Sequence, residues 1–281
     1  MSYKDLLVHL DNSDICEQRI DAAIALAKRQ EARLTGIALA LESTISTYIG
    51  IDFPASLNEQ QQEIVKQAAQ EAVDRFTAKA KAAGIQYRVK TVACPASKAP
   101  EMLAFYARHA DLTFVGQPNP DKRGKSFHEA LMNGVLHQSG RPVYMVPYIG
   151  VHKHKVRKAV IAWNGDKKSV RAVNDAIPLL RGRGEVTVLV VNPKQRGEEY
   201  GGSMGDNLVS HLKQHGIEAR VDMQTIPDLS IDTILLNYVS DIGADLLIMG
   251  AYGHSRLREK AFGGVTESIL HQMTVPVLMS E

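Results

Sequence analysis

Short apolar runs alternate with amphipathic segments along the first half of the chain. The runs at residues 6–10, 34–41, 88–93, 112–116 and 142–146 are typical of β-strands. Residues 20–27, 57–83, 97–109 and 127–138 carry apolar residues at helical spacing, and Ser13 or Asp14 is expected to cap the first helix. Strands separated by helices need crossover connections, so the pattern predicts parallel strands with helices on both faces of the sheet.

The second half of the chain repeats the first. Residues 134–147 (GVLHQSGRPVYMVP) match residues 268–281 (SILHQMTVPVLMSE), and residues 110–116 match residues 244–250, both at an offset of 134. The offset is 132 for residues 83–89 and 153 for the opening strands, which indicates about 21 inserted residues within residues 41–63. The repeat predicts two five-stranded α/β domains, at residues 1–149 and 156–281, joined by a linker at residues 150–155.

Composition and charge narrow the class of protein. Hydrophobic residues make up 44% of the chain and charged residues 23%, which excludes a disordered chain. Residues 1–150 hold 17 basic and 16 acidic residues and residues 151–281 hold 16 and 15, so no nucleic-acid partner is expected. The absence of a long apolar run, of a signal segment and of a cysteine framework predicts a cytoplasmic protein without a membrane partner.

The loop after the fourth strand of the second half is the most informative segment. Residues 250–270 read GAYGHSRLREKAFGGVTESIL, with glycines at 250, 253, 263 and 264 before the last helix. Glycines let a backbone approach a phosphate closely, and a helix N-terminus offers unpaired N–H groups. Ligands bind open parallel sheets at the carboxyl ends of strands, so the loop is predicted to cradle an anion or phosphate. Glycines that only form turns are the alternative.

This Gly-x2-Gly-x9-Gly spacing, between ADLLIMG and VTESILHQMTVPVLMS, resembles the universal stress protein family. The segment AVIAWNGDKKSVRAV at residues 159–173 fits that family too, and the resemblance covers nearly the whole chain as two tandem copies. It implies two Rossmann-like domains, a role in the stress response, and ATP as a ligand, with or without Mg²⁺. The residues that it implies for adenine, ribose and phosphates are Asn164, Val191, Gly250, Gly253, Gly263, Gly264, Val265 and Thr266.

The aligned loop of the first half has lost most of these glycines. Gly116 is kept, but the counterparts of Gly253, Gly263 and Gly264 are Asn119, Glu129 and Ala130. A carboxylate facing the phosphates would repel ATP, so the N-terminal domain is expected not to bind ATP in this way, although Asp11 keeps an acid at the adenine position.

Two departures from the family pattern leave other functions open. Gly264 stands where Ser or Thr is usual, and Asn164 stands where Asp is common, which favours a nucleotide-free interaction protein. Weak ATP hydrolysis is a further alternative, for which Asp166, Glu259 and Glu267 are the nearest acids.

Other features carry weaker expectations. The family resemblance implies that the last strands pair as an intramolecular pseudo-dimer, and a homodimer remains open. His152 and His154 are read as linker residues rather than metal ligands, Cys16 and Cys94 as packing thiols, and His9 as structural.

Overall fold

The computed structural model describes residues 2–42, 55–119, 124–149, 155–182, 184–193, 204–252 and 264–281. The chain forms two compact units, which we call the N-terminal unit (Tyr3–Arg141) and the C-terminal unit (Pro142–Glu281). The division falls before β5 (Val143–Val146), because this last strand of the first repeat pairs within the C-terminal unit. Of the linker expected at residues 150–155, residues 150–154 lie outside the described residues.

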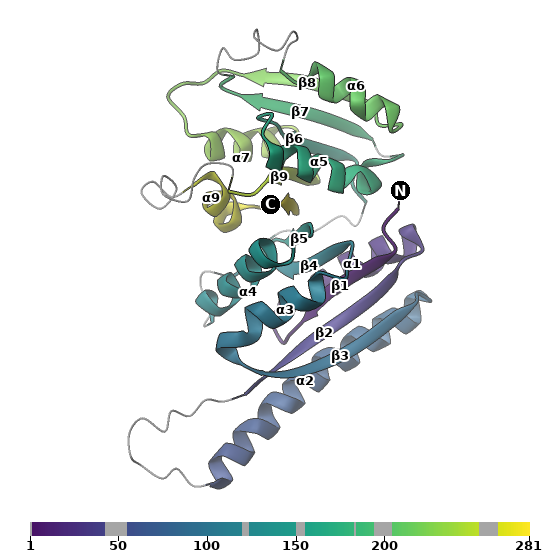
Figure 1. Cartoon of the computed structure of the whole chain (residues 1–281), viewed down its shortest axis with the longest axis vertical. Coiled ribbons are helices and arrows are strands. Elements are labelled where there is room, and N and C mark those ends of the chain that lie inside the picture. Colours follow the sequence, from purple (N-terminus) through teal and green to yellow (C-terminus); the bar gives the residue numbers. More distant parts are fainter. Residues whose placement is uncertain are drawn as a thin grey trace. The chain divides into compact units, whose positions relative to one another are not determined.

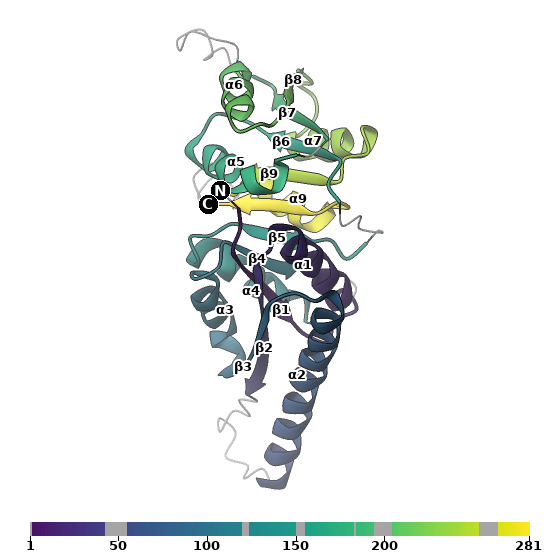
Figure 2. The ribbon, with the colours of Figure 1, turned by 90° about the vertical axis from the view of Figure 1, so that its right-hand side faces the viewer.

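The N-terminal unit is built on a parallel sheet in the order β3-β2-β1-β4. Helices α1 and α2 cover one face of this sheet, and α3 and α4 cover the other (Figures 1 and 2). The strands are β1 (Asp5–Leu10), β2 (Arg33–Glu42), β3 (Tyr87–Pro95) and β4 (Leu112–Gly116). The helices are α1 (Cys16–Gln30), α2 (Ala55–Ala83), α3 (Ala99–Ala107), which follows the short 3-10 turn η2 (Ala96–Lys98), and α4 (Lys125–Gln138).

The C-terminal unit has the strand order β5-β10-β9-β6-β7-β8, in which β5 is antiparallel to β10 and the other pairs are parallel. Helices α5 and α6 lie on one face and α7 and α9 on the other (Figure 2). The strands are β6 (Lys158–Ala162), β7 (Glu185–Val191), β8 (Ala219–Gln224), β9 (Leu246–Gly250) and β10 (Val277–Ser280). The helices are α5 (Lys167–Leu180), α6 (Asp206–Gln214), α7 (Ile231–Asp241) and α9 (Val265–Gln272).

The α/β class, the parallel pairing and the helices on both faces confirm the fold expected from the sequence. Each repeat also has the same strand register. In the first, Thr35 of β2 lies between Leu7 and Arg88; in the second, the matching residues are Thr187, Val160 and Arg220. Apolar residues of the central strands β1, β4, β6, β7 and β9 are buried on both faces, as a sheet covered by helices requires.

The predicted insertion at residues 41–63 is divided between three parts of the structure. Leu41 and Glu42 end β2, residues 43–54 lie outside the described residues, and α2 begins at Ala55. Because α2 has 29 residues where its counterpart α6 has 9, part of the extra length is helix. In the part of the chain that is described, no helix combines the length and hydropathy needed to cross a bilayer.

Candidate functional site

The structure describes six of the eight residues implied for nucleotide binding; Gly253 and Gly263 lie outside the described residues. The six sit at one edge of the C-terminal sheet, because the carboxyl ends of β6, β7 and β9 meet there. Asn164 follows β6, Val191 ends β7 and Gly250 ends β9. Gly264, Val265 and Thr266 form the start of α9.

Gly250 is fixed by a close approach of two elements. A Cβ atom there would lie 2.7 Å from the backbone C of Lys168 and 2.7 Å from the backbone N of Ser169. The first turn of α5 therefore packs directly on the end of β9. Lys168 Nζ strengthens this junction by donating to the Tyr252 carbonyl at 2.8 Å and to Glu281 Oε1 at 3.1 Å. Packing alone thus requires glycine at this position.

Thr266 and Gly264, at the start of α9, play different roles. Thr266 is buried, and its Oγ1 accepts a hydrogen bond from the Tyr252 N–H at 2.9 Å, which fixes the beginning of the glycine loop. Gly264 is the N-cap residue and provides no side-chain cap. The N–H groups of the first turn of α9 therefore receive no cap from the side chain of their N-cap residue, an arrangement that suits an anion.

Asn164 and Asp166 form a closed turn ahead of α5. Asn164 Nδ2 donates to Asp166 Oδ2 at 3.1 Å, and Asn164 Oδ1 accepts from the Asp166 N–H at 3.1 Å. Asp166 Oδ1 also caps the helix, accepting from Lys168 N at 3.0 Å and Ser169 N at 2.8 Å. Asp166 is therefore committed to the fold rather than placed as a catalytic acid or metal ligand.

The other acids considered for hydrolysis do not form a metal site in the described structure. Glu267 Oε1 lies 3.9 Å from His271 Nε2, and Glu259 lies outside the described residues. Over the described ranges, no group of three or more His, Cys, Asp or Glu side chains is arranged to hold a metal ion.

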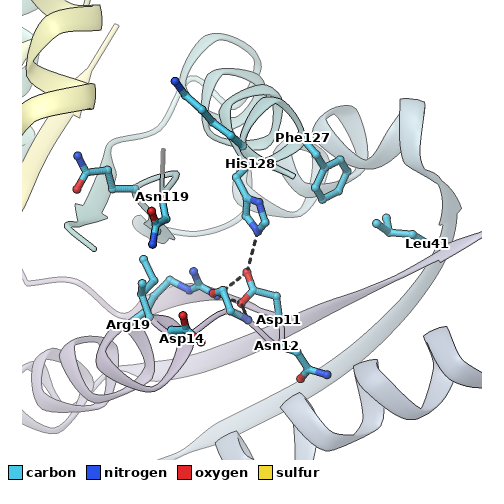
Figure 3. Close-up of a pocket in the computed structure, with 13 residues that line it drawn as sticks. Asp11, Asn12, Asp14, Arg19, Leu41, Asn119, Phe127 and His128 are labelled. Carbon is cyan, nitrogen blue, oxygen red and sulfur yellow. Dashed lines mark hydrogen bonds and ion pairs between the residues drawn. The ribbon is translucent and has the colours of Figure 1, made fainter. Parts of the chain in front are cut away.

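The N-terminal unit contains a pocket of about 460 Å³ at the corresponding edge of its own sheet. It lies beyond the ends of β1 and β4, between the start of α1 and the start of α4 (Figure 3). Its lining includes Asp11, Asn12, Arg19, Lys125, Phe127 and His128. This pocket was not anticipated, because the sequence indicated only that the half had lost its glycine loop.

A buried arginine forms the floor of the pocket. The Arg19 side chain is 1% exposed; Nη2 lies 2.9 Å from Asp11 Oδ2, and Nε donates to the His9 carbonyl at 2.7 Å. A Cβ atom on Gly116 would lie 2.5 Å from Arg19 Nη1. Gly116 is the one glycine of the four loop positions that the first repeat retains. It therefore makes room for the Arg19 guanidinium, rather than for a phosphate.

The Asp11 carboxylate interacts with two histidines whose pKa values are shifted in opposite directions. His128 Nε2 lies 3.7 Å from Asp11 Oδ2, and this interaction raises the pKa of His128 against the effect of its partial burial. His9 Nδ1 lies 3.4 Å from the same oxygen, but complete burial lowers the pKa of His9 to about 4. At neutral pH His9 is thus a neutral core residue, in keeping with the structural role expected for it.

Burial alone would raise the pKa of Asp11, but the charge of Arg19 and the interaction with His128 hold it well below its usual range. Ser13 Oγ also donates to Asp11 Oδ1, at 2.5 Å. The expectation that Ser13 or Asp14 caps α1 is wrong: the N-cap residue is Ile15, which makes no side-chain cap. The Ser13 hydroxyl is used to hold Asp11 instead.

Glu129 is paired within its own helix, since its carboxylate lies 3.7 Å from Lys125 Nζ. The pocket is lined by Lys125 and His128 from the same turn of α4. The Asp11 carboxylate in this pocket is paired with Arg19 and His128.

The two cysteines agree with the packing role expected for them. Both are buried, and burial raises the pKa of each thiol. Cys16 Sγ also accepts from the Asp11 N–H at 3.4 Å, so it helps to shape the turn below the pocket.

Comparisons with known proteins agree with this architecture. A sequence profile described as "Universal stress protein family" matches residues 155–280. A solved universal stress protein from Archaeoglobus fulgidus DSM 4304 superposes with a TM-score of 0.71 at 21% identity, covering 99% of this chain and 96% of that chain. Residues 155–280 therefore form a domain of the universal stress protein family. The first repeat, which makes up the N-terminal domain, has the same fold.

Two further relatives extend the comparison. A 44-residue segment of the chain is 43% identical to universal stress protein Slr1230 of Synechocystis; it covers 16% of this chain and 15% of that protein. A protein of Pseudomonas aeruginosa PAO1 described as functionally unknown has the same fold over 99% of this chain and 92% of its own, with a TM-score of 0.59 at 14% identity.

Proposed function

We propose that this tandem universal stress protein is a nucleotide-responsive module that binds ATP in its C-terminal domain only. The observation that carries the proposal is the difference between the two turns that follow the first strand of each repeat. Asp11 in the N-terminal domain is paired with a buried arginine, whereas Asn164 in the C-terminal domain is exposed and its hydrogen bonds to described residues stay within its own turn.

The C-terminal turn leaves hydrogen-bonding capacity for adenine. An amide has two N–H donors and two acceptor lone pairs, and the bonds to Asp166 use one donor and one lone pair of Asn164. On the phosphate side, the uncapped start of α9 follows the glycine pair at 263 and 264. Thr266 anchors the loop from below, so the phosphates would meet backbone N–H groups rather than its hydroxyl.

The N-terminal domain would need to break a buried ion pair to admit adenine in the same way. Removing one partner of such a pair leaves an uncompensated buried charge, which costs several kcal/mol (about 3–5). Asn119, Glu129 and Ala130 also replace the glycines that allow close backbone approach.

Catalysis is not part of the proposal. Mg²⁺ bound with ATP would neutralise phosphate charge, but Asp166 is occupied as a helix cap and the described residues offer no cluster to hold the ion independently. ATP therefore acts as a bound ligand whose presence stabilises the C-terminal domain. A nucleotide-free interaction protein is the competing function, favoured by the residues at 164 and 264.

Thermal unfolding with nucleotide separates these two functions. A ligand that binds the folded state raises its stability by mass action. We expect millimolar Mg-ATP to raise the melting temperature. Unchanged melting with Mg-ATP would favour the nucleotide-free protein.

The last strands support a further part of the proposal. β5 and β10, which end the two repeats, pair antiparallel with Val277 opposite Met145 and Met279 opposite Val143. An edge strand that is paired inside one chain does not require a second chain. We therefore expect an intramolecular pseudo-dimer that is monomeric in light scattering; a two-chain mass would support the homodimer instead.

A further inference from the structure

A second pocket in the N-terminal domain, of about 260 Å³, lies at the opposite end of the sheet from the Asp11 pocket. It is lined by residues from the beginnings of β1, β2 and β3 and from the end of α3. Nucleotide sites in this kind of sheet lie at the carboxyl ends of strands, so this pocket is independent of the function proposed above.

The rim of this pocket is positively charged. Arg88 and Lys90 lie two residues apart on β3 and therefore on the same face of the sheet, and both are exposed. Lys90 Nζ sits 4.6 Å from the centre of the Tyr106 ring. The acid among the described lining residues, Asp5, is already paired with Arg33, whose Nε lies 3.0 Å from Asp5 Oδ1. Within the described ranges, no ion pair therefore compensates the charges of Arg88 and Lys90 at the rim.

The floor of the pocket is apolar. Leu7 of β1 and Ile37 of β2 are buried beneath it, and Ala110 closes it after α3. The Tyr106 ring forms a side wall. An occupant would thus place an apolar body on the sheet and a negative group at the rim.

The second repeat lacks this charge arrangement, although its strands have the same register. Arg220 is the counterpart of Arg88, but Asp222 stands at the position of Lys90. Asp222 accepts hydrogen bonds from Tyr238 Oη at 2.7 Å and from Gln224 Nε2 at 2.8 Å. The reversal of charge between two copies of one fold shows that the fold does not require the cationic rim of the first repeat.

We propose that this pocket binds a small organic anion with an apolar body, of the arylcarboxylate or arylsulfonate class. The anionic group pairs with Arg88 and Lys90, and the ring system lies on Leu7 and Ile37 beside Tyr106. Apolar burial with a few placed polar groups is the usual composition of a small-molecule site.

Fluorescence titration of the full chain with 1-anilinonaphthalene-8-sulfonate, with 1-naphthoate as competitor, tests the proposal. The double variant Arg88→Gln, Lys90→Asp is expected to weaken saturable binding of the dye by about tenfold. Aspartate at position 90 reproduces Asp222 of the second repeat. Arg220→Gln is the matched control at the equivalent strand position and should bind like wild type.

Several results would overturn the proposal. These are the absence of saturable binding, equal binding by the double variant, or an equal loss in Arg220→Gln. Displacement by inorganic phosphate as effective as that by 1-naphthoate would show that the apolar floor has no role. Both altered side chains are exposed, so the variants should keep the wild-type circular dichroism spectrum; a change in that spectrum would contradict their assignment to the rim.

Discussion

The Arg19 guanidinium lies 2.9 Å from the Asp11 carboxylate in the interior of the N-terminal domain, with 1% of the arginine side chain exposed. We expect Arg19→Met to lower the free energy of unfolding by about 3–5 kcal/mol, because it leaves the Asp11 charge buried with less compensation. Urea denaturation measures this loss. The double variant Asp11→Asn, Arg19→Met should recover part of it; additive losses would contradict a coupled pair.

His128 should stabilise the protein in a pH-dependent way. Its pKa is raised in the folded state by Asp11, so its contribution is complete below the unfolded pKa of about 6.5 and is lost as pH rises through the raised folded value. The difference in unfolding free energy between wild type and His128→Gln should therefore shrink as pH rises. A difference that is constant across this range would show that the interaction with Asp11 does not depend on the imidazolium charge.

His9 should behave in the opposite sense. Its folded pKa is lowered to about 4, so the stability linked to its neutral form is present above the unfolded value of about 6.5 and is lost as pH falls toward the folded value. NMR titration should find the His9 imidazole still neutral at about pH 5.5, where an ordinary histidine is mostly charged. A midpoint at or above the ordinary value would contradict its burial beside Arg19.

The elements of the fold could be predicted because their signals are local. Apolar periodicity located strands and helices, and the repeat fixed their order twice. The cap of α1 was missed because the Ser13 hydroxyl bonds to Asp11, a neighbour that competes with the helix for the same side chain. The assignment of β5 to the C-terminal unit depends on pairing with β10, more than a hundred residues away, which no local pattern encodes.

The Asp11 pocket could not be predicted from local sequence patterns either. The end of β1, α1 and α4 bring Asp11, Arg19 and His128 together, and periodicity cannot show that side chains from separate elements share one carboxylate. One signal was present: Arg19 stands beside Ile20 on the helix that buries Ala23, and a charged residue on such a face implies a buried partner.

Gly134 of α4 provides a test of the packing between α3 and α4. A Cβ atom there would lie 2.6 Å from Pro100 Cβ and 3.1 Å from the Pro100 carbonyl oxygen. Gly134→Ala gains up to about 1 kcal/mol of helix propensity, but we expect net destabilisation of about 1–3 kcal/mol from the clash. Ser126→Ala on the exposed side of the same helix is the control and should change stability by less than about 0.5 kcal/mol. A stabilised Gly134→Ala variant would show that the helices can separate at little cost.

The central claim is that one of the two domains binds ATP, and isothermal titration with Mg-ATP tests it most directly. We expect one ATP per chain, binding abolished by Gly263→Glu, and unchanged affinity in Glu129→Gly, which alters the aligned position of the other repeat. Two ATP molecules per chain, or wild-type binding by Gly263→Glu, would contradict the account.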